Sequence, residues 1–295
     1  MILEKRVPLS YWFKLIRYDM LIMCVFSSSV FVLSMYLEHI KIPFSIVGFL
    51  GTAIALLLSF KLSQSYDRWW EARKIWGSIV NDSRSFVVQL KNFTDGSDDK
   101  LVKKMGFRQM GWCYVLGNDL RKLDSLEIAK SFVSSEELDV LQMSQNKALT
   151  MLDFHNNDLF NLHKENKIND FQQIQIDSTI VRLCASMGKA ERIKNTFFPK
   201  TYRLTLHLFI YIFLISLSFS LTDLHNAIEI PLLMVISLPF FLLEKIAMTI
   251  QDPFENKPAD TPVTEIARTI EINLKQLLGE KEIPEKVVSK TYYSL

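Results

Sequence analysis

The chain lacks most of the features by which enzymes and secreted proteins are recognised. Its three cysteines, Cys24, Cys113 and Cys184, are odd in number and far apart, so neither a disulfide framework nor a paired metal motif is indicated. No nucleophile elbow, phosphate-binding glycine loop, dinucleotide fingerprint or zinc-protease motif occurs. A formal net charge of +2 over 295 residues gives no argument for a nucleic-acid partner. We therefore expect no enzymatic activity, no cofactor, no resident metal ion and no nucleic-acid partner.

Signals for strands and for a cleavable leader are missing too. Alternating valine or threonine runs bounded by turns do not occur, and the pattern between residues 61 and 206 is helical. Residues 1–18 are mixed polar and basic, and no small-residue cleavage site follows the first apolar run. We expect an all-α fold that keeps its N-terminal segment.

What the chain does contain is long apolar sequence, since 49% of its residues are hydrophobic while 22% are charged. This mixture indicates a membrane part joined to a soluble part. Four segments are candidate membrane-spanning helices. They are Met20–Leu37, Ile42–Phe60, Leu204–Thr222 and the weaker Ile230–Leu243, which Glu244 and Lys245 separate from Ile246–Ile250. Four spans are our main prediction, with three spans or a wholly soluble helical protein as alternatives.

Basic residues predict the orientation of these spans. Lys and Arg gather before the first span, after the second and before the third, whereas the linkers within the two hairpins hold Lys41 or none. By the positive-inside rule, both termini and the central region should be cytoplasmic in a bacterial inner membrane. The predicted parts are residues 1–60 (N-terminal segment and first hairpin), 61–203 (helical cytoplasmic region), 204–250 (second hairpin) and 251–295 (C-terminal cytoplasmic helix and tail).

Helix boundaries in the soluble parts are predicted from capping residues. The acidic turn Thr94–Asp99 should separate two helices, Ser134 should open a helix as part of a capping box, and Asn169 or Asp170 should open another. Thr261 should cap a helix with Pro262 at its first position. One apolar face of that last helix must pack on its own chain or on a neighbouring subunit. Its members are Val263, Ile266, Ile270, Leu274 and Leu277.

The second span carries the one sequence pattern that suggests a pathway for ions. Gly48, Thr52, Leu56 and Phe60 recur every fourth residue, so they lie along one helix face. This face is either a helix-packing stripe or, in a ring of such helices, an apolar constriction that restricts ions by size and wetting.

A dense aromatic and charged block follows that span. Its members are Tyr66, Asp67, Arg68, Trp69, Trp70, Glu71 and Arg73, with Trp76 beyond them. We interpret the aromatic residues as an interfacial belt and expect the charged residues to pair with one another at helical spacing, so structural roles are favoured over ligand contact. His155 and His163 suggest a metal site only weakly against a packed or solvated pair.

These residues resemble a known family. The run Ser65-Tyr-Asp-Arg-Trp-Trp-Glu-Ala-Arg73, with Trp76-Gly77 and Asn81-Asp-Ser-Arg84, looks like the signature of the bacterial bestrophin homologues. The segments 252–256 and, less specifically, 268–274 are similar to the same family. The resemblance covers nearly the whole chain and implies a homopentameric ion channel with a membrane neck formed by the second span and a helical cytoplasmic cavity.

The resemblance also implies particular pore residues. The neck positions would be Thr52, Leu56 and Phe60, although the family usually has a bulky apolar residue where Thr52 stands. A cytoplasmic constriction before the third span would be Ile174 or Ile176. The calcium clasp of animal bestrophins, which conduct anions, would fall on residues 255–260, where two carboxylates and Lys257 make calcium gating doubtful.

The prediction is a pentameric inner-membrane channel that passes monovalent ions. Because bacterial members resembling this chain are generally cation channels, we expect cations such as sodium. The alternatives are an anion (chloride) channel of the same architecture, or a membrane-anchored interaction protein without transport. The expected partners are further copies of the chain, membrane lipid and monovalent ions.

Overall fold

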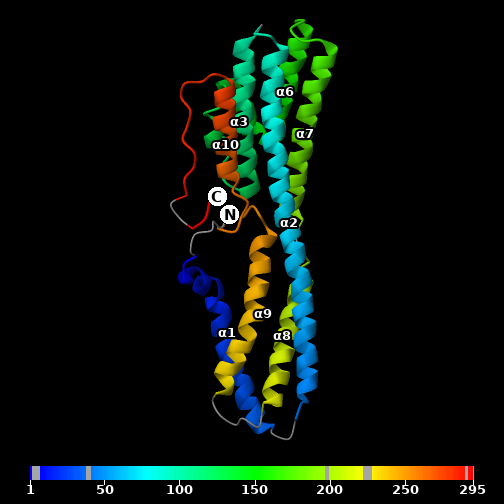
Figure 1. The fold of residues 1–295 in the computed structure, drawn as a ribbon, viewed down its shortest axis with the longest axis vertical. Coiled ribbons are helices and arrows are strands. Elements are labelled where there is room, and N and C mark those ends of the chain that lie inside the picture. Colours follow the sequence, from blue (N-terminus) through cyan, green and yellow to red (C-terminus); the bar gives the residue numbers. More distant parts are fainter. Residues whose placement is uncertain are drawn as a thin grey trace. The chain divides into compact units, whose positions relative to one another are not determined.

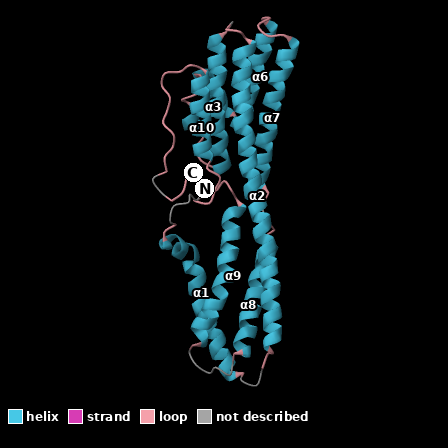
Figure 2. Ribbon diagram, viewed as in Figure 1, coloured by secondary structure: helices cyan, strands magenta, loops and turns pink. Residues whose placement is uncertain are grey.

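The regular elements of the protein are α-helices, as Figures 1 and 2 show. The structure, a computed structural model, describes residues 1, 7–37, 41–96, 98–196, 199–221, 228–289 and 292–294. Within these ranges the helices are α1 (Leu9–Tyr36), α2 (Phe44–Phe93), α3 (Asp99–Arg121), α4 (Leu126–Ala129), α5 (Ser135–Met143), α6 (Lys147–Lys164), α7 (Asp170–Asn195), α8 (Lys200–Ser220), α9 (Glu229–Gln251) and α10 (Val263–Leu277). The prediction of an all-α fold is confirmed.

The chain divides into two compact units. The span unit comprises Lys5–Arg68 and Phe197–Asp252, and the bundle unit comprises Met1–Glu4, Trp69–Thr196 and Pro253–Leu295. Helix α2 contributes to both, because its first part belongs to the span unit and its remainder to the bundle unit.

The four predicted spans are confirmed as helices that are long and apolar enough to cross a membrane. They lie within Ser10–Tyr36, Phe44–Phe93, Thr201–Ser220 and Glu229–Gln251. The fourth is continuous through Glu244 and Lys245, so these two charges do not end the helix.

The core of the span unit lies where α2 meets α8 and α9. Val47, Ile54 and Leu58 of α2 are buried together with Ile210 and Phe213 of α8. A Cβ added at Gly51 would lie 3.2 Å from Phe213 Cε2, so the small residue admits the aromatic ring close to the helix. At Gly51 the second span thus lets α8 approach closely.

The core of the bundle unit is built by α3, α6, α7, α10 and the later part of α2. Trp76, Phe86 and Trp112 are fully buried, and Trp112 Nε1 donates to the Ala148 carbonyl oxygen at 3.0 Å. The apolar face of α10 packs against α3 of the same chain, which decides between the two alternatives left open for that face. Gly117 of α3 permits this approach, because a Cβ there would lie 2.5 Å from Val263 Cγ1.

Most predicted helix starts are observed. The Ser134 hydroxyl accepts from the Glu137 amide, and Asn169 forms a full capping box with Gln172. The prediction for Thr261 is wrong, since α10 begins at Val263 with Pro262 as its N-cap. The reason is tertiary: Arg121 donates to the Thr261 carbonyl oxygen and to Thr264 Oγ1, which holds Thr261 in the buried approach to the helix.

Candidate functional site on the exposed face of helix α2

The predicted neck residues lie on the face of α2 that its own chain leaves uncovered. Leu56 and Phe60 are 56% and 57% exposed, and Thr52 is exposed as well. Ile54 and Leu58, which point to the other side of the helix, are each 1% exposed. The described part of the chain therefore does not use this stripe for its own helix packing, and the stripe is available to water, lipid or another subunit.

The chemistry of this face is almost wholly apolar. Thr52 Oγ1 donates to the Gly48 carbonyl oxygen at 2.9 Å, so its one proton is used within the helix. From Gly48 to Phe60 the helix carries no ionisable side chain. A face of this kind offers an ion little to replace its hydration shell, so a ring of such faces would hold ions back until it is wide enough to stay wet.

The charged side chains that follow this face have partners both within α2 and on α9. Glu71 pairs with Lys74 at 2.6 Å, and within the span unit Arg68 Nε donates to the Gln251 carbonyl oxygen at 3.0 Å. Gln251 ends α9, where carbonyl oxygens lack partners inside the helix. Arg68 thus has an acceptor at a helix end that is distant in sequence, and its expected pairing with Glu71 stays a prediction.

The aromatic side chains of the block differ in their contacts and in their exposure. In the bundle unit Trp69 Nε1 donates to the Ala259 carbonyl oxygen at 2.9 Å, and the Trp69 and Trp70 rings stack with centroids 6.3 Å apart. Tyr66 and Trp70 are 52% and 47% exposed. Asp67 is exposed and Arg73 is half-buried. Trp69 thus ties α2 to the segment after α9.

The two candidates for a cytoplasmic constriction differ in burial. Ile174 of α7 is 66% exposed, whereas Ile176 is fully buried in the core of the bundle unit. A buried core side chain cannot line an open passage, so Ile176 does not fit that role. Phe171 and Val181 share the exposed face with Ile174 and extend its apolar surface.

The span unit also contains a charged cluster that the sequence reasoning missed. Lys61 Nζ and Arg203 Nε each lie 3.4 Å from Glu244 Oε1, and His207 Nε2 lies 3.4 Å from Glu244 Oε2. The sequence marks Lys61, Arg203 and Glu244 only as edges of apolar runs, and His207 lies inside one. Their convergence depends on the packing of α2, α8 and α9.

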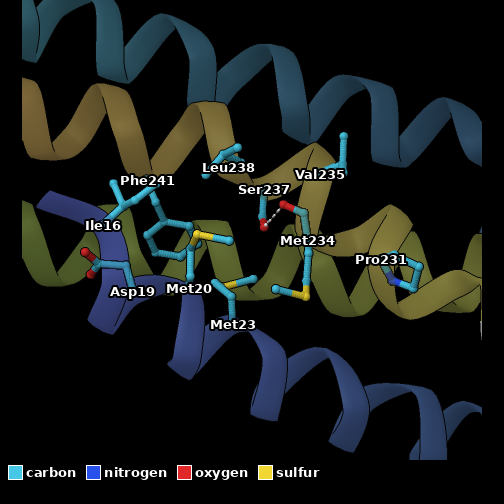
Figure 3. A pocket seen from close by; sticks show the side chains of 10 residues that line it. All are labelled: Ile16, Asp19, Met20, Met23, Pro231, Met234, Val235, Ser237, Leu238 and Phe241. Carbon is cyan, nitrogen blue, oxygen red and sulfur yellow. Dashed lines mark hydrogen bonds between the residues drawn. The ribbon is translucent and has the colours of Figure 1, made fainter. Parts of the chain in front are cut away.

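An apolar crevice lies between α1 and α9 of the span unit, as Figure 3 shows. Its volume is about 230 Å³ and its lining includes Met20, Met23 and Met234. The two polar side chains in the lining are already bonded: Asp19 to Lys245 at 3.2 Å and Ser237 to the Met234 carbonyl oxygen at 3.0 Å. The crevice therefore suits a flexible apolar group better than an ion.

In the bundle unit the buried charges are matched. Arg108, whose side chain is 1% exposed, contacts both Glu137 and Asp158, and Lys104 Nζ lies 3.0 Å from Glu137 Oε1. Burial by itself raises the pKa of Glu137, but its bonds to Arg108 and Lys104 outweigh this and lower it. Two cations thus face two carboxylates, the arrangement that makes a buried ionic network tolerable.

His155 and His163, which suggest a metal site only weakly in the sequence, have separate surroundings in the structure. His155 is fully buried, with Nδ1 3.4 Å from Arg108 Nη1 and its ring against Phe86. Burial, with Arg108 and Lys104 close by, lowers its pKa well below the usual value. His163 contacts Asp170 at 2.7 Å. Among the described residues no group of three or more potential metal ligands is found.

The comparisons with known proteins agree with this arrangement. A family model described as bacterial/fungal bestrophin protein matches residues 12–276. A relative from Escherichia coli, named a voltage-dependent anion channel-forming protein, is 31% identical over 274 residues, which cover 92% of this chain and 89% of the relative. A relative of the same description from Mesorhizobium japonicum is 25% identical, and the match covers 92% of this chain and 87% of the relative.

A solved structure shares the fold. The crystal structure of a bacterial bestrophin homologue from Klebsiella pneumoniae superposes with a TM-score of 0.83 at 25% identity, covering 90% of this chain and all of that one. A helical fold with four candidate spans and an uncovered apolar face on the second defines a polytopic membrane protein. The chain belongs to the bestrophin family, in its bacterial and fungal branch.

Proposed function

We propose that the chain is one subunit of a homopentameric ion channel whose neck is formed by Thr52, Leu56 and Phe60 of α2. The observation that supports this most is the exposed, uncharged face of α2, which the rest of the described chain leaves unpacked. The channel-forming relatives support the same function. A membrane-anchored interaction protein without transport has no comparable support.

The neck acts as an apolar barrier. An ion that enters a narrow ring of leucine and phenylalanine loses hydration without gaining polar partners, so passage needs a ring wide enough to stay wet. Thr52 makes the outer part of this ring less apolar than Leu56 and Phe60 do. Opening then means a change in width or wetting at Leu56 and Phe60.

We further propose that the permeant ions are anions such as chloride. The expectation of cations has no support from the relatives, whose names describe anion channels and so favour the alternative.

The proposed channel lies in a bacterial inner membrane with both termini cytoplasmic. The parts keep their predicted bounds: hairpins within 1–60 and 204–250, and cytoplasmic parts at 61–203 and 251–295. The basic flanks of the spans support this orientation. Ile174, the exposed one of the two candidates, would line a second constriction in the cytoplasmic part.

Reversal potential in a planar bilayer under a threefold salt gradient tests this function. Purified protein should carry current that reverses near the anion equilibrium potential, and its mass in mild detergent should equal five subunits. Reversal near the cation potential would overturn the anion assignment. A well-folded oligomer that passes no ions in either the bilayer or a liposome flux assay would favour the interaction protein.

A further inference from the structure

The charged cluster of Lys61, Arg203, His207 and Glu244, here called the basic cluster, has more positive than negative groups. Lys61 and Arg203 are basic residues that both face Glu244, His207 adds a third basic group, and Glu244 is their shared carboxylate. With a neutral His207, two positive charges face one negative charge.

The contacts within the basic cluster are long. All three distances to Glu244 are 3.4 Å, whereas charge-assisted hydrogen bonds are usually about 2.7–2.9 Å long. The Lys61 side chain is 1% exposed and that of Glu244 is 3% exposed. A buried ammonium with three donors and one distant acceptor is poorly compensated, so Glu244 alone leaves the positive charge of the cluster incompletely balanced.

The basic cluster lies where apolar helix meets polar sequence. Lys61 directly follows the uncharged run 42–60, Arg203 directly precedes 204–222, and Glu244 directly follows 230–243. Such positions lie at the level of lipid headgroups. Under the proposed orientation this is the cytoplasmic leaflet, where anionic lipids attract basic pockets between membrane helices.

The cluster is open on one side. The side chains of Arg203 and His207 are 46% and 24% exposed, so a group arriving from outside meets them before it meets Lys61. The Tyr202 hydroxyl donates to the Leu57 carbonyl oxygen at 2.9 Å, which fixes the start of α8 against α2 and holds Arg203 beside Lys61. The two basic groups that can be reached are therefore held by packed helices.

We propose that the basic cluster binds the phosphate of an anionic phospholipid. The phosphate accepts from Arg203 and His207 and balances the excess positive charge that Glu244 leaves. The lipid then acts as a structural partner of α2, α8 and α9 just beyond the neck. This binding does not depend on ion conduction and can be tested without it.

Native mass spectrometry of the full-length oligomer tests the proposal. Protein freed of bound lipid is titrated with phosphatidylglycerol, with phosphatidylethanolamine, or with inorganic phosphate. We expect phosphatidylglycerol to be retained about fivefold or more over phosphatidylethanolamine, since one basic residue near a membrane surface contributes about that factor. Retention of inorganic phosphate without a preference for the anionic lipid would overturn the lipid assignment.

Two glutamine variants, one conservative lysine variant and a control locate the site. Arg203→Gln and His207→Gln should each lower the preference for phosphatidylglycerol several-fold, while Arg203→Lys keeps most of it. Arg17→Gln is the matched control, because Arg17 is also an exposed arginine near the start of a span, outside the basic cluster. Equal loss in Arg17→Gln and Arg203→Gln would contradict the proposal, as would unchanged binding in both cluster variants. Size-exclusion chromatography verifies that each variant keeps its oligomeric state.

Discussion

In the bundle unit the apolar face of α10 is covered by α3, whereas in the span unit Leu56 and Phe60 of α2 stay more than half exposed. Leu208 of α8 and Val235 of α9 are similarly uncovered. One chain is thus enough to complete the core of the bundle unit. The span unit needs lipid or other subunits to cover its apolar surface, as expected for a part that works inside a membrane.

The same contrast holds for charge. In the bundle unit Arg108 and Lys104 face Glu137 and Asp158, so positive and negative groups are equal in number. In the span unit Lys61 and Arg203 share Glu244 alone, at longer distances. The charges of the first network balance within the chain, whereas the second keeps an excess of basic groups, which the proposed phosphate would balance.

The largest expected effect on stability comes from disrupting the charged network of Arg108, Lys104, Glu137 and Asp158. Arg108→Met leaves the buried Glu137 and the partly buried Asp158 with Lys104 as their one remaining cation in this network. Removing one partner from a buried ion pair costs about 3–5 kcal/mol. Thermal unfolding of the purified protein should show a clear drop in the midpoint. Lys130→Met, which removes an exposed pair with Glu127, should leave it nearly unchanged. Equal midpoints for the two variants would show that the Arg108 network does not stabilise the bundle unit.

A smaller loss of stability is expected from a substitution at the contact between α3 and α10. Gly117→Ala places a Cβ against Val263, a stiff β-branched side chain, and such overpacking costs about 1–3 kcal/mol. Gly188→Ala is the control, because a Cβ there meets nothing within 4 Å and the change favours the helix. Circular dichroism melts should separate the two variants. A Gly117→Ala protein as stable as Gly188→Ala would mean that α10 is free to move outward.

Acid should weaken the bundle unit through His155. Its pKa is lowered in the folded protein, so above about pH 6.5 both states are neutral and the full stability is present. Below that pH only the unfolded chain takes up the proton, and stability falls by up to about 1.4 kcal/mol per pH unit. Melts at pH 7.5 and 5.5 should therefore differ less in His155→Leu than in the native chain. An identical pH dependence would assign the acid sensitivity to other groups.

Features that depend on residues close together in the sequence, such as spans and helix starts, were mostly predicted correctly. The charge-free runs located the four spans, and Asn169 located the start of α7 because a capping box is complete within four residues. The start at Thr261 was missed by one residue since Arg121, far away in sequence, holds that segment. The bond from Arg68 to Gln251 and the basic cluster were missed for the same reason, because their partners lie on other helices.

The four-residue spacing located the stripe on α2, but it did not show what surrounds that stripe. Spacing places Thr52, Leu56 and Phe60 on one face without saying whether that face is packed. The exposure of these side chains excludes packing by the described part of the same chain, and burial removes Ile176 as a candidate for the second constriction, which leaves Ile174 as a proposal. Whether a face is covered depends on tertiary contacts, which no local pattern encodes.

Single-channel recording of Leu56→Ala tests the central claim most directly. Leu208→Ala is the matched control, because Leu208 is a leucine of equal exposure on α8 (55% against 56%) outside the proposed neck. We predict that Leu56→Ala raises conductance or open probability several-fold by widening and wetting the neck, while Leu208→Ala behaves like the native channel. Native currents from Leu56→Ala, or the same change in both variants, would contradict the assignment of this face of α2 to the ion pathway.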